Sequence, residues 1–318
     1  MRLKSVLLKQ SCNRAYRKSG FRSLNSIRAA SRYLFHGFFR NPVVILTLIM
    51  GFVLSYLLSI RVMEAAEYFG SSMQVVEPFI WTFGDPTAIM LTSVLLIFMF
   101  SDLPGLTAAS PFYLMRITKL HWLLGQFLYI AIASGIYTGY IVLCTCLLCA
   151  RYSYIGNIWS RTAMYLAYSD TGKEINVPST VKMMESITPY ECMMWIAVLL
   201  LCYCLSLAFL MMTASLFFGG KSGIFAGFVY SLYGFLLDRE VLRKLLGLSE
   251  TQMWKVNSLI CWISPLNHAT YDKHDFGHDN QPSLWQSVFV FGVILLIFMC
   301  LSFRAMKRYN FTFLGESD

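Results

Sequence analysis

Histidine and aspartate side chains are concentrated in one short segment near the C-terminal end of the chain. Within twelve residues the segment contains His268, Asp272, His274, Asp275, His278 and Asp279. Imidazole and carboxylate groups are zinc ligands, and His274 and His278 would share one helix face because they are four residues apart. However, Gly277 and the neighbouring aspartates are typical of a loop, and no HExxH motif is present. We therefore expect a solvated loop without a metal ion, with His274 and His278 as the candidate ligands if one binds.

A second stretch that could do chemistry is the sequence GGKS at 219–222, which resembles the end of a phosphate-binding loop. The full motif needs a glycine five residues before its last glycine, where this chain has Ser215. It also needs a preceding β-strand, whereas residues 205–218 read as a continuous apolar helix. We therefore expect a tight turn here. The chain is predicted to be no enzyme and to bind no cofactor of its own.

The elements that would carry these segments are unusually apolar. The chain has 318 residues, 57% of them hydrophobic and 14% charged, whereas about 25% of a soluble domain is charged. Because a helix rises 1.5 Å per residue, about 20 apolar residues cross a hydrocarbon core of about 30 Å. Six windows without Asp, Glu, Lys or Arg predict an all-α polytopic membrane protein. Its six transmembrane helices are expected at about 42–60, 86–101, 121–149, 192–218, 222–237 and 283–303.

Lysine and arginine are distributed unevenly over the predicted loops. Residues 1–40 carry ten basic residues and no acidic one, and the segments on the same side of six spans together carry 16 basic and 3 acidic residues. The remaining loops carry 10 basic and 14 acidic residues. The positive-inside rule then predicts a multi-pass protein of the cell membrane with both termini in the cytoplasm. The basic charge is explained by this topology and by anionic lipid, so we expect no nucleic-acid partner.

Three regions follow from this reading. Residues 1–40 form a basic cytoplasmic arm, in which 23–39 has the apolar spacing of an amphipathic elbow helix lying in the membrane surface. Residues 41–303 form the six-helix transmembrane domain, and 304–318 form a cytoplasmic tail. The spans contain no ionisable Asp, Glu, Lys or Arg, which argues against an ion-driven carrier. Cys192 and Cys261 both fall on the outer side, and whether they form a disulfide stays open.

The inner loop 101–119, between the second and third spans, has the residue types of a short structured helix. Asp102 could cap a helix, and Pro104 suits a first helical turn. Arg116 and Lys119 are three residues apart and would share one helix face. Two interpretations remain open: an ordinary connection, or a cytoplasmic coupling helix that transmits force from a soluble motor.

Small and aromatic residues occur together in the fifth span. Gly223 and Gly227 are four residues apart, a spacing that permits close approach of two helices. Tyr230 and Tyr233 follow in the same span. Helix packing accounts for the glycines, while the tyrosines could also line a path for an amphipathic substrate.

Together these features resemble the permease subunit of bacterial ABC-2-type exporters. The resemblance is carried by FMFSDLPG and HWLLGQ within 98–126, by FFGGKSG between the fourth and fifth spans, and by ISPLNHA at 263–269. It implies a pair of permeases, identical or homologous, each docked to a separate ABC ATPase subunit that binds ATP and Mg²⁺. It also implies export of a peptide, an antimicrobial compound or a drug-like substrate.

The resemblance assigns roles to particular residues. The coupling region would contain Asp102, Pro104, Arg116 and Lys119. The substrate path or dimer interface would contain Gly223, Gly227, Tyr230 and Tyr233. Two other functions stay open: a metal-dependent membrane enzyme with an outer-face His/Asp site, and a non-transporting immunity or anchor subunit.

Overall fold

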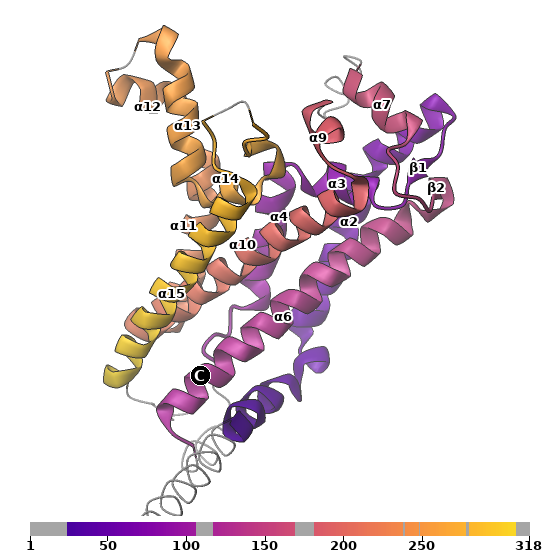
Figure 1. The fold of residues 1–318 in the computed structure, drawn as a ribbon. Helices are drawn as coiled ribbons and strands as arrows, with labels where there is room; N and C mark the ends of the chain where they lie inside the picture. Colours follow the sequence, from indigo (N-terminus) through magenta and orange to yellow (C-terminus); the bar gives the residue numbers. More distant parts are fainter. Residues whose placement is uncertain are drawn as a thin grey trace, which may run out of the picture.

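The longest helices run through the charge-free stretches of the sequence. The computed structural model describes residues 24–105, 117–168, 181–237, 239–247, 249–277 and 280–309. The longer labelled helices are α2 (Pro42–Phe69), α4 (Pro86–Met99), α6 (Lys119–Leu148), α10 (Pro189–Phe218), α11 (Gly220–Leu236) and α15 (Leu284–Arg308) (Figure 1). Four of them start at a residue whose side chain accepts a hydrogen bond from a backbone N–H of the first turn: Asn41, Asp85, Thr118 and Ser283.

Shorter elements surround this bundle. A helix over 24–35 and a 3-10 turn, η1 (Phe38–Arg40), precede α2. The other helices are α3 (Glu77–Phe83), α7 (Arg161–Tyr168), α9 (Val181–Ser186), α12 (Arg239–Leu245), α13 (Met253–Ile263) and α14 (Pro265–Ala269). Further 3-10 turns are η2 (Ala150–Tyr152), η3 (Glu250–Gln252) and η4 (Tyr271–Lys273). The strands β1 (Met73–Gln74) and β2 (Ser153–Tyr154) pair in parallel, with Met73 opposite Ser153.

Among the described residues, four helices are long and apolar enough to cross a membrane: α2, α6, α10 and α15. α3 and α4 together would make a fifth, but they meet at an angle of 83°. α11 is apolar yet has only 17 residues, which is about 25 Å of helix. The chain is therefore a helical protein with four to five candidate spans, consistent with a multi-pass membrane protein, where the sequence predicted six.

α10 and α15 run in the same direction. The rings of Trp195 and Trp285, near the start of each helix, have centroids 4.9 Å apart. The hydroxyls of Thr213 and Ser302, near the end of each helix, lie 2.9 Å apart. Contacts between matching ends require parallel axes. α11 returns antiparallel to α10 after the short turn at Gly219.

α2 and α6 are likewise parallel to each other. The hydroxyl of Tyr140 donates to the carbonyl of Leu48 at 3.0 Å, in the earlier half of α2. Just beyond the end of α6, the hydroxyl of Tyr152 donates to Glu67, in the last turn of α2, at 2.7 Å. Both helices therefore point toward the same end of the molecule.

α4 runs against α6. The Tyr137 hydroxyl contacts the carbonyl of Thr92 at 3.3 Å, while Phe100, after α4, lies with its ring centroid 6.4 Å from that of the earlier residue Tyr129. The six long helices thus alternate in direction. One end of the bundle carries residues 24–40, 100–105 and the C-terminal end of α15, and we name it the arm end (Figure 1). The opposite end, named the loop end, carries α7, α9, α12 and α13.

α10 lies at the centre of the packing. It contacts α3, α4, α6, α11, α14 and α15. Leu199, Tyr203 and Leu207 on this helix are fully buried. By contrast α2 and α15 present many large apolar side chains on the surface, including Leu46, Leu57 and Leu296. An apolar outer surface of this kind suits helices that face lipid.

Candidate functional site at the arm end of the bundle

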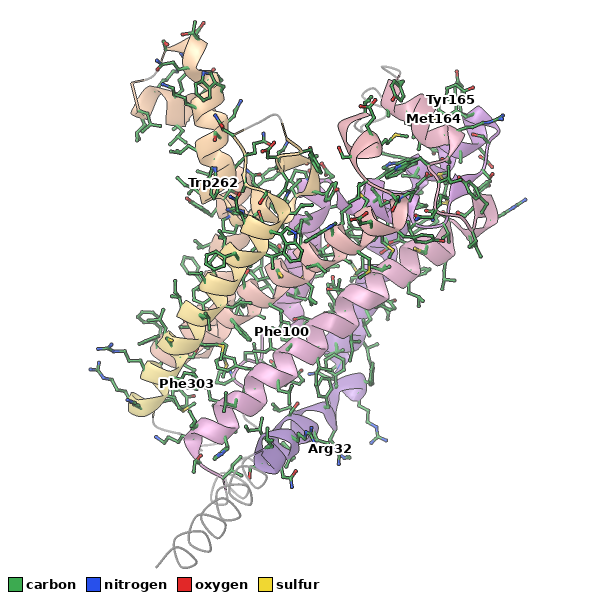
Figure 2. All side chains as sticks on the ribbon, viewed as in Figure 1. Arg32, Phe100, Met164, Tyr165, Trp262 and Phe303 are labelled. Carbon is green, nitrogen blue, oxygen red and sulfur yellow. The ribbon has the colours of Figure 1, made fainter. Side chains whose placement is uncertain are left out.

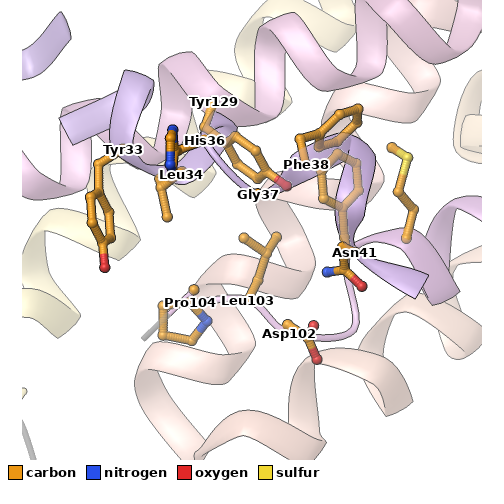
Figure 3. A pocket seen from close by; sticks show the side chains of 13 residues that line it. Tyr33, Leu34, His36, Gly37, Phe38, Asn41, Asp102, Leu103, Pro104 and Tyr129 are labelled. Carbon is orange, nitrogen blue, oxygen red and sulfur yellow. The ribbon is translucent and has the colours of Figure 1, made fainter. Parts of the chain in front are cut away.

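A cavity of about 540 Å³ lies at the arm end, between the N-terminal helix and the residues that follow α4. Figure 3 shows Asp102, Leu103 and Pro104 on one side of this cavity. Leu34, His36 and Tyr129 approach it from the other side. The walls of the cavity are therefore formed by three separate parts of the chain: the helix 24–35, the segment 100–105 and α6.

The N-terminal helix is held tightly against α6 at Gly125. A Cβ atom at Gly125 would lie 2.6 Å from the Cβ of Ala30, closer than two carbon atoms approach without a shift. The ring of Phe35, on the same side, is 4.9 Å from that of Tyr129. Only glycine at 125 allows the two helices to be this close, so the arm is fixed to the start of α6.

The segment 100–105 is attached to the same helix. A Cβ atom at Gly105 would lie 3.1 Å from Cδ2 of Leu34. Leu103 and Pro104 are buried, while Asp102 is exposed. The segment 100–105 is therefore in direct contact with the N-terminal helix.

The first turn of α6 also contacts the C-terminal end of the described chain. Lys119 donates from Nζ to the backbone carbonyl of Tyr309 at 2.8 Å. Figure 2 shows Arg32 and Phe303 toward the arm end, with Met164 and Tyr165 at the loop end. Four segments from distant parts of the sequence are thus joined at the arm end.

Three of the four residues expected in the coupling region lie at the same end of the bundle. Asp102, Pro104 and Lys119 lie at the arm end, and Arg116 falls outside the described residues. The expectation that Asp102 caps a helix with Pro104 in its first turn is wrong, because residues 101–105 form turns and bends. The backbone N–H of Leu103 donates to the carbonyl of Phe100 at 3.1 Å, and this turn buries Leu103.

The residues expected on the substrate path have different surroundings. A Cβ at Gly223 would lie 2.7 Å from the carbonyl oxygen of Met211, and Gly227 contacts Met211 and α4. Tyr230 faces α10, where its hydroxyl lies 2.7 Å from that of Ser206. Tyr233 is 43% exposed on the outer face of α11. Of the four residues, Tyr233 is the one with an exposed side chain.

The histidine-rich segment differs from the solvated loop expected for it. His274 is fully buried, because the segment folds back onto the start of α15. Both of its ring nitrogens are hydrogen-bonded, to the carbonyl of Tyr271 and to Ser287. His278 falls outside the described residues. In the part of the chain that the structure describes, no group of three potential ligands is placed to hold a metal ion.

Sequence reasoning missed a buried carboxylate at the loop end. Glu77 is fully buried and accepts hydrogen bonds from the backbone N–H of Gln74 at 3.0 Å and of Ser160 at 2.7 Å. The hydroxyl of Ser160 also donates to it, at 2.6 Å. Glu77 thereby ties the segment before α3 to the start of α7. The only sequence signal was an acidic residue directly before the apolar run 78–83.

The two cysteines expected on the outer side, Cys192 and Cys261, are buried. No disulfide joins them. A comparison of the whole chain with known proteins adds no relative: no family model, no curated protein and no solved structure matches it.

Proposed function

We propose that this chain is the permease subunit of an ATP-driven ABC-2-type exporter. The observation that supports it best is the junction of the helix 24–35, the segment 100–105, α6 and the end of α15 at one end of the bundle. Most of the charged residues described at that end are basic, as in cytoplasmic segments of membrane proteins. Because several helices meet at this surface, a force that a soluble ATPase applies there would act on all of them.

The energy source in this proposal is a separate ABC ATPase subunit. ATP and Mg²⁺ bind to that partner, and this chain contributes no residue to their chemistry. Closure of the ATPases moves the loop 101–119, and the contact of Gly105 with Leu34 passes this movement to the N-terminal helix. Lys119 passes it to the end of α15. The permease works as a pair, formed with a second copy or a homologous permease.

In the proposal all six long helices cross the membrane, with the arm end in the cytoplasm. α4 and α11 are short for lipid-facing spans, and they contact each other and α10. Short spans are tolerated where protein covers them. The outer face of α11 carries a shallow cavity of about 330 Å³ lined by Val229, Leu232, Tyr233 and Leu236. This apolar surface is complementary to the apolar part of an amphipathic substrate, such as a peptide or a drug-like compound.

Charge reversal in the coupling loop tests the proposed function. Arg116→Glu and Lys119→Glu should uncouple ATP hydrolysis from transport when the protein is co-expressed with its ATPase, while membrane insertion stays normal. Glu64→Ala, an exposed change near the loop end, is the matched control. Wild-type transport by both reversal variants would contradict the coupling role. Absence of any ATP-dependent transport by the wild-type complex would favour the non-transporting immunity or anchor subunit.

The orientation is tested separately by labelling introduced cysteines in intact cells. A membrane-impermeant maleimide should label Ile155→Cys, which is 88% exposed at the loop end. Lys221→Cys, in the first turn of α11, should react only after the cells are opened. The reverse pattern would place the arm end outside and would contradict docking to a cytoplasmic ATPase.

A further inference from the structure

Two buried histidines at the loop end share one serine hydroxyl. The Oγ atom of Ser287, in the first turns of α15, lies 2.8 Å from Nδ1 of His268 and 2.8 Å from Nε2 of His274. The other nitrogen of each ring lies beside a backbone carbonyl. Nε2 of His268 is 3.0 Å from the oxygen of Trp262, and Nδ1 of His274 is 3.1 Å from that of Tyr271.

The four contacts need one hydrogen more than the neutral side chains provide. A carbonyl oxygen only accepts, so His268 and His274 must each use their single N–H toward a carbonyl. Both remaining ring nitrogens are then acceptors that face the same hydroxyl. Ser287 has one hydrogen and can donate to only one of them. The fourth contact therefore sets two lone pairs against each other at hydrogen-bond distance.

We propose that His268, Ser287 and His274 form a binding site for a single proton. One imidazole becomes an imidazolium and donates to the hydroxyl oxygen, while the hydroxyl donates to the other, neutral ring. All four contacts are then hydrogen bonds. The site stands apart from the proposed function, because it depends only on contacts within this chain.

Burial favours uptake of a single proton and determines the pH range in which it binds. His268 and His274 are 1% and 0% exposed. Burial lowers the pKa of His274 to about 4, and the neighbouring His268 also contributes to lowering it. Burial likewise lowers the pKa of His268. Uptake therefore lies on the acid side of the ordinary histidine pKa, and the first positive charge disfavours a second one beside it.

Titratable groups on neighbouring elements act on Tyr271 and Asp272, which precede His274 in η4. They are Glu191 and Cys192, which act on Tyr271, and Asp85 and Lys273, which act on Asp272. Asp272 and Lys273 pair with each other at 3.3 Å. Glu191 and Cys192 act on the hydroxyl of Tyr271, not on the histidine rings. Burial thus dominates the lowered pKa of His274; the hydrogen bond to the Tyr271 carbonyl opposes it, and His268 adds a smaller lowering.

The bound proton connects two elements at the loop end. His268 lies on α14 and His274 follows η4, while Ser287 belongs to α15. The proton therefore binds where the segment 264–274 meets the start of α15. A metal ion is a poorer occupant, because the donor set holds two imidazoles and a hydroxyl, and zinc sites use three or four nitrogen, sulfur or carboxylate ligands.

Exchange of the imidazole C2 hydrogen, followed by mass spectrometry, tests the proposal on the full chain in nanodiscs. As the pH falls from about 6.5 to below about 4, the protonated fractions of His268 and His274 should rise together and level off at a sum of about one. The exposed His36 serves as an internal reference. A sum near two, or no uptake by either ring above about pH 4, would overturn the proposal.

Three variants sharpen the result. Ser287→Ala removes the hydroxyl that the two rings share, and the proton affinity of the cluster should fall at least about tenfold. Ser302→Ala, elsewhere on α15, should leave the proton affinity unchanged. His274→Gln supplies the missing hydrogen from its amide, so His268 should lose its acid titration even if Ser287→Ala fails to fold. Unchanged titration in either cluster variant would overturn the proposal. So would protection of both rings at neutral pH by added Zn²⁺ alone.

Discussion

Gly125 of α6 and Ala30 of the N-terminal helix are in such close contact that a Cβ atom on Gly125 would lie 2.6 Å from the Cβ of Ala30. This contact fixes the helix 24–35 to the first half of α6. Ala30 and the nearby Ser31 are both buried by it. The proposed transmission of force depends on this attachment.

Gly125→Ala should therefore weaken the attachment of the arm. The added methyl group overfills the contact, and overpacking typically costs about 1–3 kcal/mol. Gly135→Ala is the matched control, because a Cβ at Gly135, on the same helix, meets nothing within 4 Å. The thermal unfolding temperature of the purified protein should fall for the first variant and hold for the second. Equal unfolding temperatures would show that the arm is not fixed at Gly125.

Gly223→Ala should separate α10 from α11. Its Cβ would lie 2.1 Å from Oγ of Ser215 and 2.7 Å from the carbonyl oxygen of Met211, and a backbone atom cannot move aside cheaply. We expect destabilisation of about 1–3 kcal/mol, measured as a loss of thermal stability. Gly139→Ala, which meets nothing within 4 Å, is the control. A neutral effect of Gly223→Ala would mean that the two helices are further apart than described.

Glu77→Ala should destabilise the loop end. The change leaves the N–H groups of Gln74 and Ser160 and the hydroxyl of Ser160 without their acceptor. Each buried donor without a partner costs about 1–3 kcal/mol. Glu77→Gln keeps an acceptor oxygen and should cost less. If Glu77→Ala unfolds at the same temperature as the surface variant Glu64→Ala, Glu77 does not hold this region together.

The long helices could be predicted because their apolar stretches are continuous. The predicted ranges 121–149 and 192–218 differ from α6 and α10 by at most three residues at either end. The end of α2 was less predictable, since its first charged residue, Arg61, does not stop the helix. Gly70, in the left-handed conformation, ends it.

The buried polar contacts could not be predicted, because they join residues that are distant in the sequence. Aspartates and a glycine beside His274 suggested a solvated loop, yet Ser287, thirteen residues away, buries it. Glu77 depends on Ser160, which is 83 residues away. The turn at Asp102 was read as a helix start because residue types that cap helices also favour turns.

Stability should fall on mild acidification through His274. Its pKa is lowered from 6.5 to about 4 by burial, so the folded protein favours the neutral ring while the unfolded chain binds a proton. The stabilisation is present above pH 6.5 and is lost as the pH falls toward about 4. Unfolding temperatures measured across this range should decline for the wild type and decline less for His274→Gln. Identical slopes would rule out a contribution from His274.

The proposed function depends on a separate ATPase subunit. The most direct measurement is ATP hydrolysis by the protein co-expressed and co-purified with a candidate ABC ATPase, reconstituted in lipid nanodiscs. We predict a stoichiometric complex whose vanadate-sensitive hydrolysis changes when Arg116→Glu or Gly125→Ala is introduced. A permease that purifies alone, or a complex whose hydrolysis ignores both changes, would contradict the account.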